Sequence, residues 1–231
     1  TLGDLFGLDH GWADDGTILM DGDVNLLKGA ILCSVVPALT HNWEKACERS
    51  FGVAPQVVSA RSCAHLLNID KTSFVELGAD RVADAVAAKA IFGAPVVVVD
   101  FGTATNMEVI DKDGVFVGGV IAPGVESSMR SLMSRAVLLR AVELEDPGVA
   151  IGRDSSEAIQ IGVVSGEAAR VDGLVERIQA ELGYKTKVVA TGGLAHRIAP
   201  LSHTITEVDV ELTLQGLRLI FNELKKCDNQ R

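Results

Sequence analysis

A carboxylate and two hydroxyl side chains follow a run of four valines near the middle of the chain. Asp100 ends the apolar run at 96–99, and Gly102, Thr103 and Thr105 come directly after it. A buried strand that ends on a carboxylate and turns through glycine presents backbone N–H groups and hydroxyls to a phosphate, and Asp100 can hold a cation beside it. We therefore predict a phosphate-binding loop here. The alternative is an ordinary hairpin with a solvated aspartate.

Asp80 and Arg81 form a second group that could do chemistry, because they lie at the start of an expected helix. A carboxylate in that position can accept a proton from a substrate hydroxyl. The neighbouring guanidinium can bind a carboxylate or a phosphate. The alternative is a helix N-terminal charge beside a surface arginine.

A glycine pair, Gly192 and Gly193, follows the strand-like run "KVVAT". Glycines let the backbone approach a flat ligand closely, so the pair favours a contact with a nucleotide. Taken alone, such a pair is more often a simple turn.

The elements expected around these residues alternate between strand and helix in the first part of the chain. Residues 29–36 are short, apolar and partly β-branched, which predicts a strand that ends at Pro37. Helical spacing of apolar residues follows up to Gly52, and a second strand is expected near 55–60. A further amphipathic helix is expected over 78–92. This alternation is typical of an α/β fold.

The second part of the chain begins with strands and continues mainly with helices. We expect an antiparallel meander, one helix after Pro123, a long helix opened by Asp154, one further strand and a closing helix. The meander strands are expected at 96–99, 106–110 and 115–121 with a turn at 111–114, the long helix at 155–182, the last strand at 186–191 and the closing helix near 212–220.

Composition limits the class of function. The formal net charge is −10 with no basic run, which argues against nucleic acid or an anionic membrane surface as the main partner. We find neither a membrane-length apolar segment nor a signal peptide, so we expect a cytoplasmic protein. The cysteines lack C-x-x-C spacing, which favours free thiols over a zinc site or disulfides. They are Cys33, Cys47, Cys63 and Cys227.

The order D-x-G-T-x-T before two hairpin strands is similar to the phosphate element of the actin, hexokinase and sugar-kinase group. Over most of its length the chain resembles the type III pantothenate kinases. The matching text, in the family's order, is "CSVVPALT", "GADRVADAVAA", "DFGTATNMEVID", "GGVIAPG", "GRDSSEAIQIG", "VVATGGLA" and "ELTLQGLRLI". The resemblance implies an actin-like ATPase fold of two ribonuclease-H-like halves, 1–93 and 94–231, with mixed sheets flanked by helices. It also implies a homodimer with the pantothenate site at its interface.

The resemblance further implies an ATP-dependent kinase that converts pantothenate to 4'-phosphopantothenate, the first step of coenzyme A biosynthesis. Asp80 would be the general base, and Asp100 would hold the monovalent cation, K⁺ or NH₄⁺, that the family requires; Mg²⁺ would accompany ATP. The implied substrate-binding residues are Gly78, Ala79, Asp80, Arg81 and Ser155. The implied ATP-binding residues are Gly102, Thr103, Thr105, Gly192 and Gly193.

Two departures from the family pattern leave alternatives open. No D-x-G-N-T loop precedes "CSVVP", and residues 14–23 do not replace it, so the N-terminal half is expected to be incomplete. Either the first strands are missing upstream of Thr1, which would leave this chain nearly inactive, or the chain is a non-catalytic paralogue that acts as a regulatory or transcription accessory factor. A tyrosine often found before "GADR" is also absent. Another actin-fold phosphotransferase or phosphatase is a third, less favoured possibility.

Overall fold

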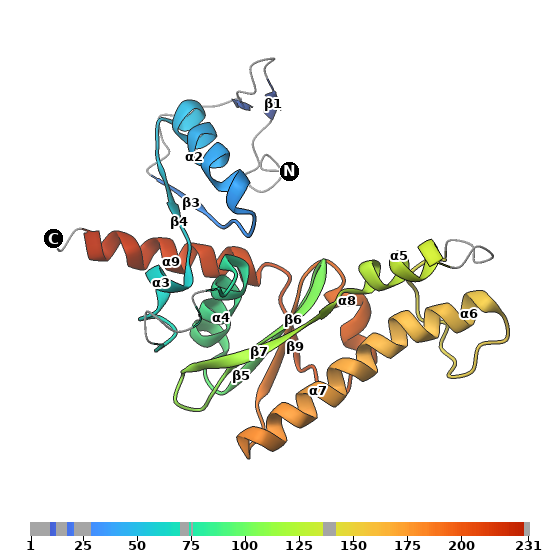
Figure 1. Ribbon diagram of the computed structural model, residues 1–231. Coiled ribbons are helices and arrows are strands. Elements are labelled where there is room, and N and C mark those ends of the chain that lie inside the picture. The colour runs from blue at the N-terminus through green and yellow to red at the C-terminus, as the bar shows by residue number, and fades with distance from the viewer. Residues whose placement is uncertain are drawn as a thin grey trace.

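The computed structural model describes residues 10–12, 18–20, 29–69, 74, 76–135 and 142–228. Its centre is a five-stranded sheet in the order β7-β6-β5-β8-β9 (Figure 1). β5, β8 and β9 are parallel, whereas β6 is antiparallel to both β5 and β7. The strands are β5 (Val96–Phe101), β6 (Ala104–Ile110), β7 (Phe116–Pro123), β8 (Lys187–Thr191) and β9 (Glu207–Val208).

This strand order is that of a ribonuclease-H-like half, in which three meander strands are followed by two parallel strands on the other side of the first. The meander and its turn were predicted correctly. Asp111 shapes the turn, since its carboxylate accepts hydrogen bonds from the backbone N–H groups of Asp113 and Val115, both at 2.9 Å. The expected mixed α/β architecture is therefore confirmed for this part of the chain.

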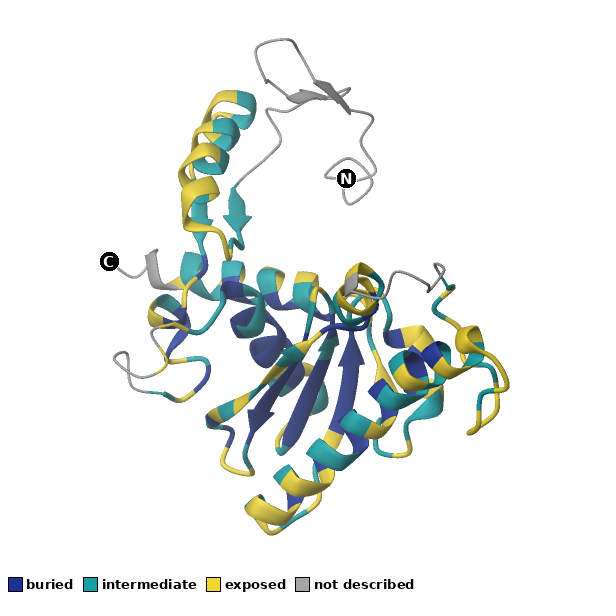
Figure 2. Ribbon diagram, turned by 45° about the vertical axis from the view of Figure 1, so that its right-hand side comes forward, coloured by how far each residue is buried: buried dark blue, intermediate teal, exposed yellow. Residues whose placement is uncertain are grey.

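Helices cover both faces of the sheet. Alternate β5 residues enter opposite cores, because successive side chains of a strand point to opposite faces. Val96 and Val98 pack with α4 (Ala79–Phe92) and α9 (Leu212–Asp228). Val97 and Val99 pack with α7 (Gly166–Leu182) on the other face. Figure 2 shows the sheet as the most deeply buried part of the molecule.

The pair α4 and α9 owes its close packing to small residues. α4 contains six alanines, and at Gly216 on α9 an added Cβ would collide with the Ala83 carbonyl. α4 begins after Gly78 and ends at Gly93, whose φ of +80° is easy only for glycine. The sequence therefore allows this helix pair to lie tightly against the sheet.

The N-terminal elements are smaller. β1 (His10–Trp12) and β2 (Ile18–Met20) pair antiparallel, and β3 (Ala30–Leu32) and β4 (Pro55–Val57) pair parallel. Between β3 and β4, α2 (Pro37–Phe51) ends at the expected Gly52, and the short α3 (Ala60–Cys63) follows β4. α2 has no buried residue and stands away from the main sheet (Figures 1 and 2). The division into halves 1–93 and 94–231 stays a prediction.

The expected single helix over 155–182 is wrong in one respect. The structure has α6 (Ser155–Gln160), a π-helical segment η2 (Ile161–Ser165) and then α7. Gly162 and Gly166 fall in or beside this segment, where the absence of side chains tolerates the wider turn. The predicted start of α6 is confirmed. Asp154 caps the helix, since its side chain accepts a hydrogen bond from the Glu157 backbone N–H at 2.9 Å.

The remaining described elements are short or lie at the rim. α5 (Val125–Arg135) follows β7 as expected, whereas α8 (Ala195–Ile198) and η3 (Ala199–Leu201) were not predicted. β9 was also missed, since a two-residue strand carries no periodic signal. Within the described residues, no helix is both long and apolar enough to cross a membrane.

Candidate active site

A row of polar side chains crosses the sheet at the carboxyl end of β5. Strand pairing places Asn106 beside Asp100 on one side and Thr191 beside it on the other. All three face α4 and α9, because Val98 and Val189, two residues earlier on their strands, belong to that core. Polar groups in an otherwise apolar layer mark this end of the sheet as the candidate active site.

Two glycine turns meet at the Asp100 carboxylate. A Cβ added at Gly192 would collide with Asp100 Oδ1 and lie 2.7 Å from the Phe101 carbonyl oxygen, and the φ of +89° at Gly192 also favours glycine. A Cβ at Gly102 would lie 3.5 Å from Asp100 Oδ2. The structure therefore brings Gly192 to the Asp100 and Gly102 turn, although Gly192 follows Asp100 by more than ninety positions in the sequence. Gly193 is exposed at the same turn.

The surroundings of Asp100 disfavour the charged form of its carboxyl group. Its pKa is raised to about 6, mainly by burial and in addition by the negative charge of Asp80. Within the part of the chain that the structure describes, no hydrogen bond or ion pair reaches its carboxylate. A half-buried carboxylate without a partner is a favourable place for a cation.

Asp80 lies in the first turn of α4, where the helix dipole favours negative charge. Its Oδ1 accepts a hydrogen bond from the Arg81 backbone N–H at 2.8 Å. Gly78 leaves room for this carboxylate, since a Cβ there would lie 2.5 Å from Oδ1. Ala79 is buried beneath the turn. The half-buried Asp80 is thus held at the mouth of the site by the "GADR" segment, and its charge acts on Asp100.

One helical turn further, Asp84 is a buried carboxylate that the sequence prediction missed. Its side chain is 1% exposed, and its Oδ1 accepts a hydrogen bond from the Thr213 hydroxyl of α9 at 2.6 Å. Burial raises the pKa of Asp84 to about 7, opposed by the Thr213 hydrogen bond and assisted by the charges of Asp100 and Asp80. Three aspartates therefore repel one another around the end of β5.

Arg81 turns away from the aspartates toward β6. Its Nε donates to Glu108 Oε1 at 2.6 Å, and its Nη2 donates to the Met107 carbonyl at 3.3 Å. Glu108 is 0% exposed. Burial raises the pKa of Glu108, whereas the hydrogen bond and charge of Arg81 lower it and favour the ionised form of Glu108.

The loop after Asp100 is held from the other side by the start of α5. The Thr103 carbonyl accepts hydrogen bonds from the Gly124 backbone N–H at 3.2 Å and from the Ser127 hydroxyl at 2.8 Å. Thr103 itself is exposed, so its side chain is accessible to a ligand. Thr105, by contrast, is buried, and its hydroxyl donates to Glu167 Oε1 at 2.7 Å. Thr105 therefore ties the loop to α7.

The fold does not bring Ser155 near Asp80. It is exposed at the first position of α6, at the opposite end of the molecule from α4 (Figures 1 and 2).

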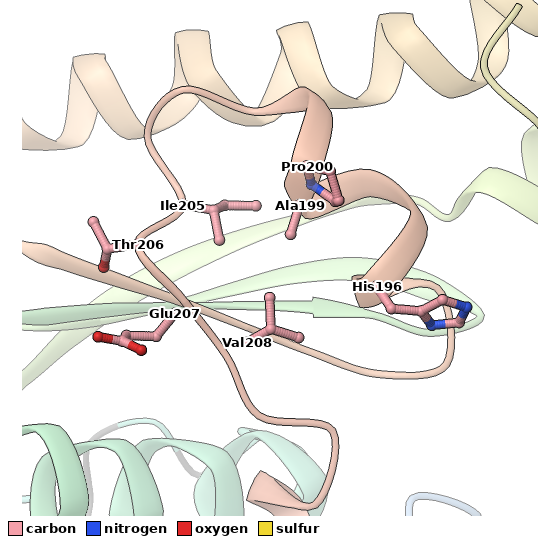
Figure 3. A pocket seen from close by; sticks show the side chains of 7 residues that line it. All are labelled: His196, Ala199, Pro200, Ile205, Thr206, Glu207 and Val208. Carbon is pink, nitrogen blue, oxygen red and sulfur yellow. The ribbon is translucent and has the colours of Figure 1, made fainter.

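A cavity of about 470 Å³ lies just beyond the Gly192–Gly193 turn, beside β9 (Figure 3). It includes none of the predicted site residues. Its lining is His196, Ala199, Pro200, Ile205, Thr206, Glu207 and Val208. Ala199 belongs to the core shared with α7, so this cavity opens on the face of the sheet away from α4.

Among the described residues, no group of three or more His, Cys, Asp or Glu side chains is arranged to hold a metal ion. Cys33, Cys47 and Cys63 are free thiols, as expected. The pKa of Cys33 is raised to about 12, mainly by burial and in addition by the charges of Asp80 and Asp84. The effect of these two charges places Cys33 close to the site. Asp100 alone among the predicted residues thus offers an unpaired, half-buried carboxylate to a cation.

Sequence reasoning missed Asn106, Glu108 and Asp84. The signals were present: Asn106 and Glu108 are two apart within an apolar strand, and Asp84 follows Asp80 by one helical turn. Both spacings place the polar groups on one face of their element.

The sequence profile of the type III pantothenate kinase family matches residues 15–177. A type III pantothenate kinase of Frankia alni is 42% identical over 219 residues, which are 93% of this chain and 86% of the relative. One from Thermomicrobium roseum is 42% identical over 198 residues, which are 86% of this chain and 76% of the relative.

Among solved structures, one from Campylobacter jejuni, described under the Baf family of transcriptional activators, aligns with a TM-score of 0.57 and 19% identity. The alignment covers 88% of this chain and 87% of that one. At this identity the likeness concerns the fold alone.

Proposed function

We infer that this chain, which belongs to the type III pantothenate kinase family, phosphorylates pantothenate with ATP, the first step of coenzyme A biosynthesis. The observation in the structure that carries the inference is the meeting of Asp80 with Asp100, a candidate base beside a candidate phosphate loop. Both belong to motifs by which the chain resembles the family. A regulatory role has no comparable support from the site.

On this proposal Asp80 is the general base. Its carboxylate lies at the mouth of the site and accepts the proton of the pantothenate hydroxyl as that oxygen attacks the γ-phosphorus of ATP. Phosphoryl transfer depends mainly on positioning and on offsetting negative charge. Gly78 and Ala79 hold Asp80 in place, and Arg81 supplies positive charge on the acceptor side.

The nucleotide would lie against the two glycine turns. Gly102 and the exposed Thr103 would contact the phosphates, and Gly192 and Gly193 would let the backbone approach the nucleoside. Support comes from the tight approach of Gly192 to Asp100 and from the hydrogen bonds that hold the Thr103 carbonyl. Thr105 would hold the same loop in place through its hydrogen bond to Glu167.

A monovalent cation, K⁺ or NH₄⁺, would be held by Asp100, whose carboxylate is half-buried and has no partner among the described residues. Such an ion supplies positive charge beside the phosphates. Mg²⁺ would arrive with ATP, because it is usually bound through substrate phosphates and only one or two carboxylates. ATP as a substrate also favours the cytoplasm as the place of the reaction.

Ser155 would contact pantothenate only if a second copy of the chain brings it there. Its exposure at the start of α6, far from α4, supports a homodimer in which Ser155 of one protomer faces Asp80 of its partner. The halves 1–93 and 94–231 would then be the two bodies that enclose the nucleotide.

The test is a pantothenate-dependent assay of ADP formation with identification of 4'-phosphopantothenate by mass. Asp80→Asn should abolish most turnover, whereas Asp113→Asn, on the exposed hairpin turn, should behave as wild type. Absence of pantothenate-dependent ATP consumption by the wild-type protein would refute the proposed function.

A further inference from the structure

Glu108 lies where an apolar residue would be expected. It is on the inner strand β6, and its neighbours on the same face are the fully buried Val98, across on β5, Ile110 and the polar Asn106. Its side chain is 0% exposed. A carboxylate in such a layer loses its hydration, which is costly unless a partner compensates.

The compensating partner is Arg81 alone. Arg81 Nε donates to Glu108 Oε1 at 2.6 Å, and the second oxygen, Oε2, is buried without a hydrogen bond from any described residue. A buried ion pair with one oxygen unsatisfied adds little to stability, because desolvation offsets much of the attraction. Fold stability therefore does not explain why this strand carries a carboxylate.

The ion pair does immobilise the guanidinium. Arg81 Nη2 also donates to the Met107 carbonyl at 3.3 Å, and a Cβ at Gly119 on β7, the residue paired with Glu108, would lie 2.7 Å from Nη2. The guanidinium thus lies directly on the backbone of β6 and β7. Of the five N–H donors of an arginine, the described residues occupy two, which leaves about three for a ligand.

We propose that Glu108 is a positioning residue that fixes the Arg81 guanidinium so that its free N–H donors bind the carboxylate of pantothenate. This inference rests on the proposed function. Arg81 follows Asp80, the residue proposed to meet the acceptor hydroxyl, whereas the phosphate loop lies at Gly102 and Gly192. A planar guanidinium held at one edge can still pair with a carboxylate through its other edge.

The test compares pantothenate with pantothenyl alcohol, in which a CH₂OH group replaces the carboxylate. Glu108→Gln keeps the volume and one hydrogen-bond acceptor but loses the charge that holds Arg81. We expect the ratio of kcat/KM for pantothenate to that for the alcohol to fall about tenfold, because a charge-assisted hydrogen bond is roughly twice as strong as a neutral one. The loss should fall on the KM for pantothenate, while the KM for ATP stays unchanged.

Glu167→Gln is the matched control. Glu167 is also buried, at 4% exposed, and also paired with an arginine, Arg170, but on the opposite face of the sheet. Its substitution should leave the substrate ratio at the wild-type value, whatever happens to stability. In an Arg81→Ala background, Glu108→Gln should change the ratio less than about twofold, since its effect passes through Arg81.

An unchanged ratio of the two kcat/KM values in a folded Glu108→Gln protein overturns the inference. If the KM for ATP rises at the same time, Arg81 is assigned to a phosphate instead. If Glu108→Gln does not fold, Glu108→Asp decides in its place, because withdrawing the carboxylate by one methylene should also lower the ratio. A wild-type protein without activity on pantothenate would refute the proposed function, and this inference with it.

Discussion

Asp84→Asn should stabilise the protein, and increasingly so as the pH rises. The carboxylate is 1% exposed, and burial together with the charges of Asp100 and Asp80 raises its pKa from 3.8 to about 7. Between these values the folded state keeps a proton that the unfolded state has released, so folding stability falls as the pH rises through this window. Asparagine carries no such penalty, and its amide oxygen can still accept the Thr213 hydrogen bond.

The magnitude follows from the rise in the pKa. A difference of about three pH units corresponds to about 4 kcal/mol at full ionisation, at roughly 1.36 kcal/mol per unit. Below about pH 3 the pH-dependent advantage of the variant should vanish, since Asp84 is then protonated in both the folded and the unfolded state. Between pH 5 and pH 8 the advantage of the variant should grow by about 2–3 kcal/mol.

Urea unfolding at pH 5, 6, 7 and 8 measures this effect, in choline chloride without metal ions so that no bound cation offsets the charges. Asp113→Asn, on the exposed hairpin turn, is the control and should show no trend in its difference from wild type. A difference between Asp84→Asn and wild type that stays constant with pH would refute the reasoning. So would a variant less stable than wild type at pH 8.

Three further outcomes are expected. Asp80→Asn should lower turnover by about 10²–10⁴-fold, the usual contribution of a general base, while the thermal unfolding curve stays as in wild type; a variant that keeps most activity would remove Asp80 from that role. Replacement of sodium by potassium or ammonium should raise the rate steeply if Asp100 holds a monovalent cation, and equal rates in all three salts would contradict this. Gly192→Ala should destabilise the fold by about 1–3 kcal/mol and raise the KM for ATP, because the methyl group meets Asp100 at a positive φ. Gly183→Ala has a similar φ of +79° with no atom within 4 Å of the new carbon, so it should show the backbone cost alone; equal losses in both variants would mean that the contact with Asp100 is unimportant.

Local patterns in the sequence predicted most of the larger elements. The meander from Val96 to Pro123 could be predicted because β-branched runs alternate with turn residues. α4 could be predicted because apolar residues recur at helical spacing up to Gly93. The phosphate loop at Asp100 and the "GADR" segment could also be predicted, because the residues that carry their chemistry are neighbours in the sequence. Elements of two to four residues, such as β9 and α8, were not, because they depend on contacts that local pattern does not contain.

The tertiary structure alone decided which of these groups act on one another. The parallel pairing of β5 with β8 brings Gly192 onto Asp100, and the packing of α4 over the sheet brings Asp80 and Asp84 to the same carboxylate. The partner of Arg81 could not be predicted either, because Glu108 lies 27 residues away and faces it only once β6 is in the sheet. Local sequence specifies strand, helix and turn through short-range sterics and periodicity. Burial, pKa and ion pairing depend on distances between segments, which exist only after the chain has folded.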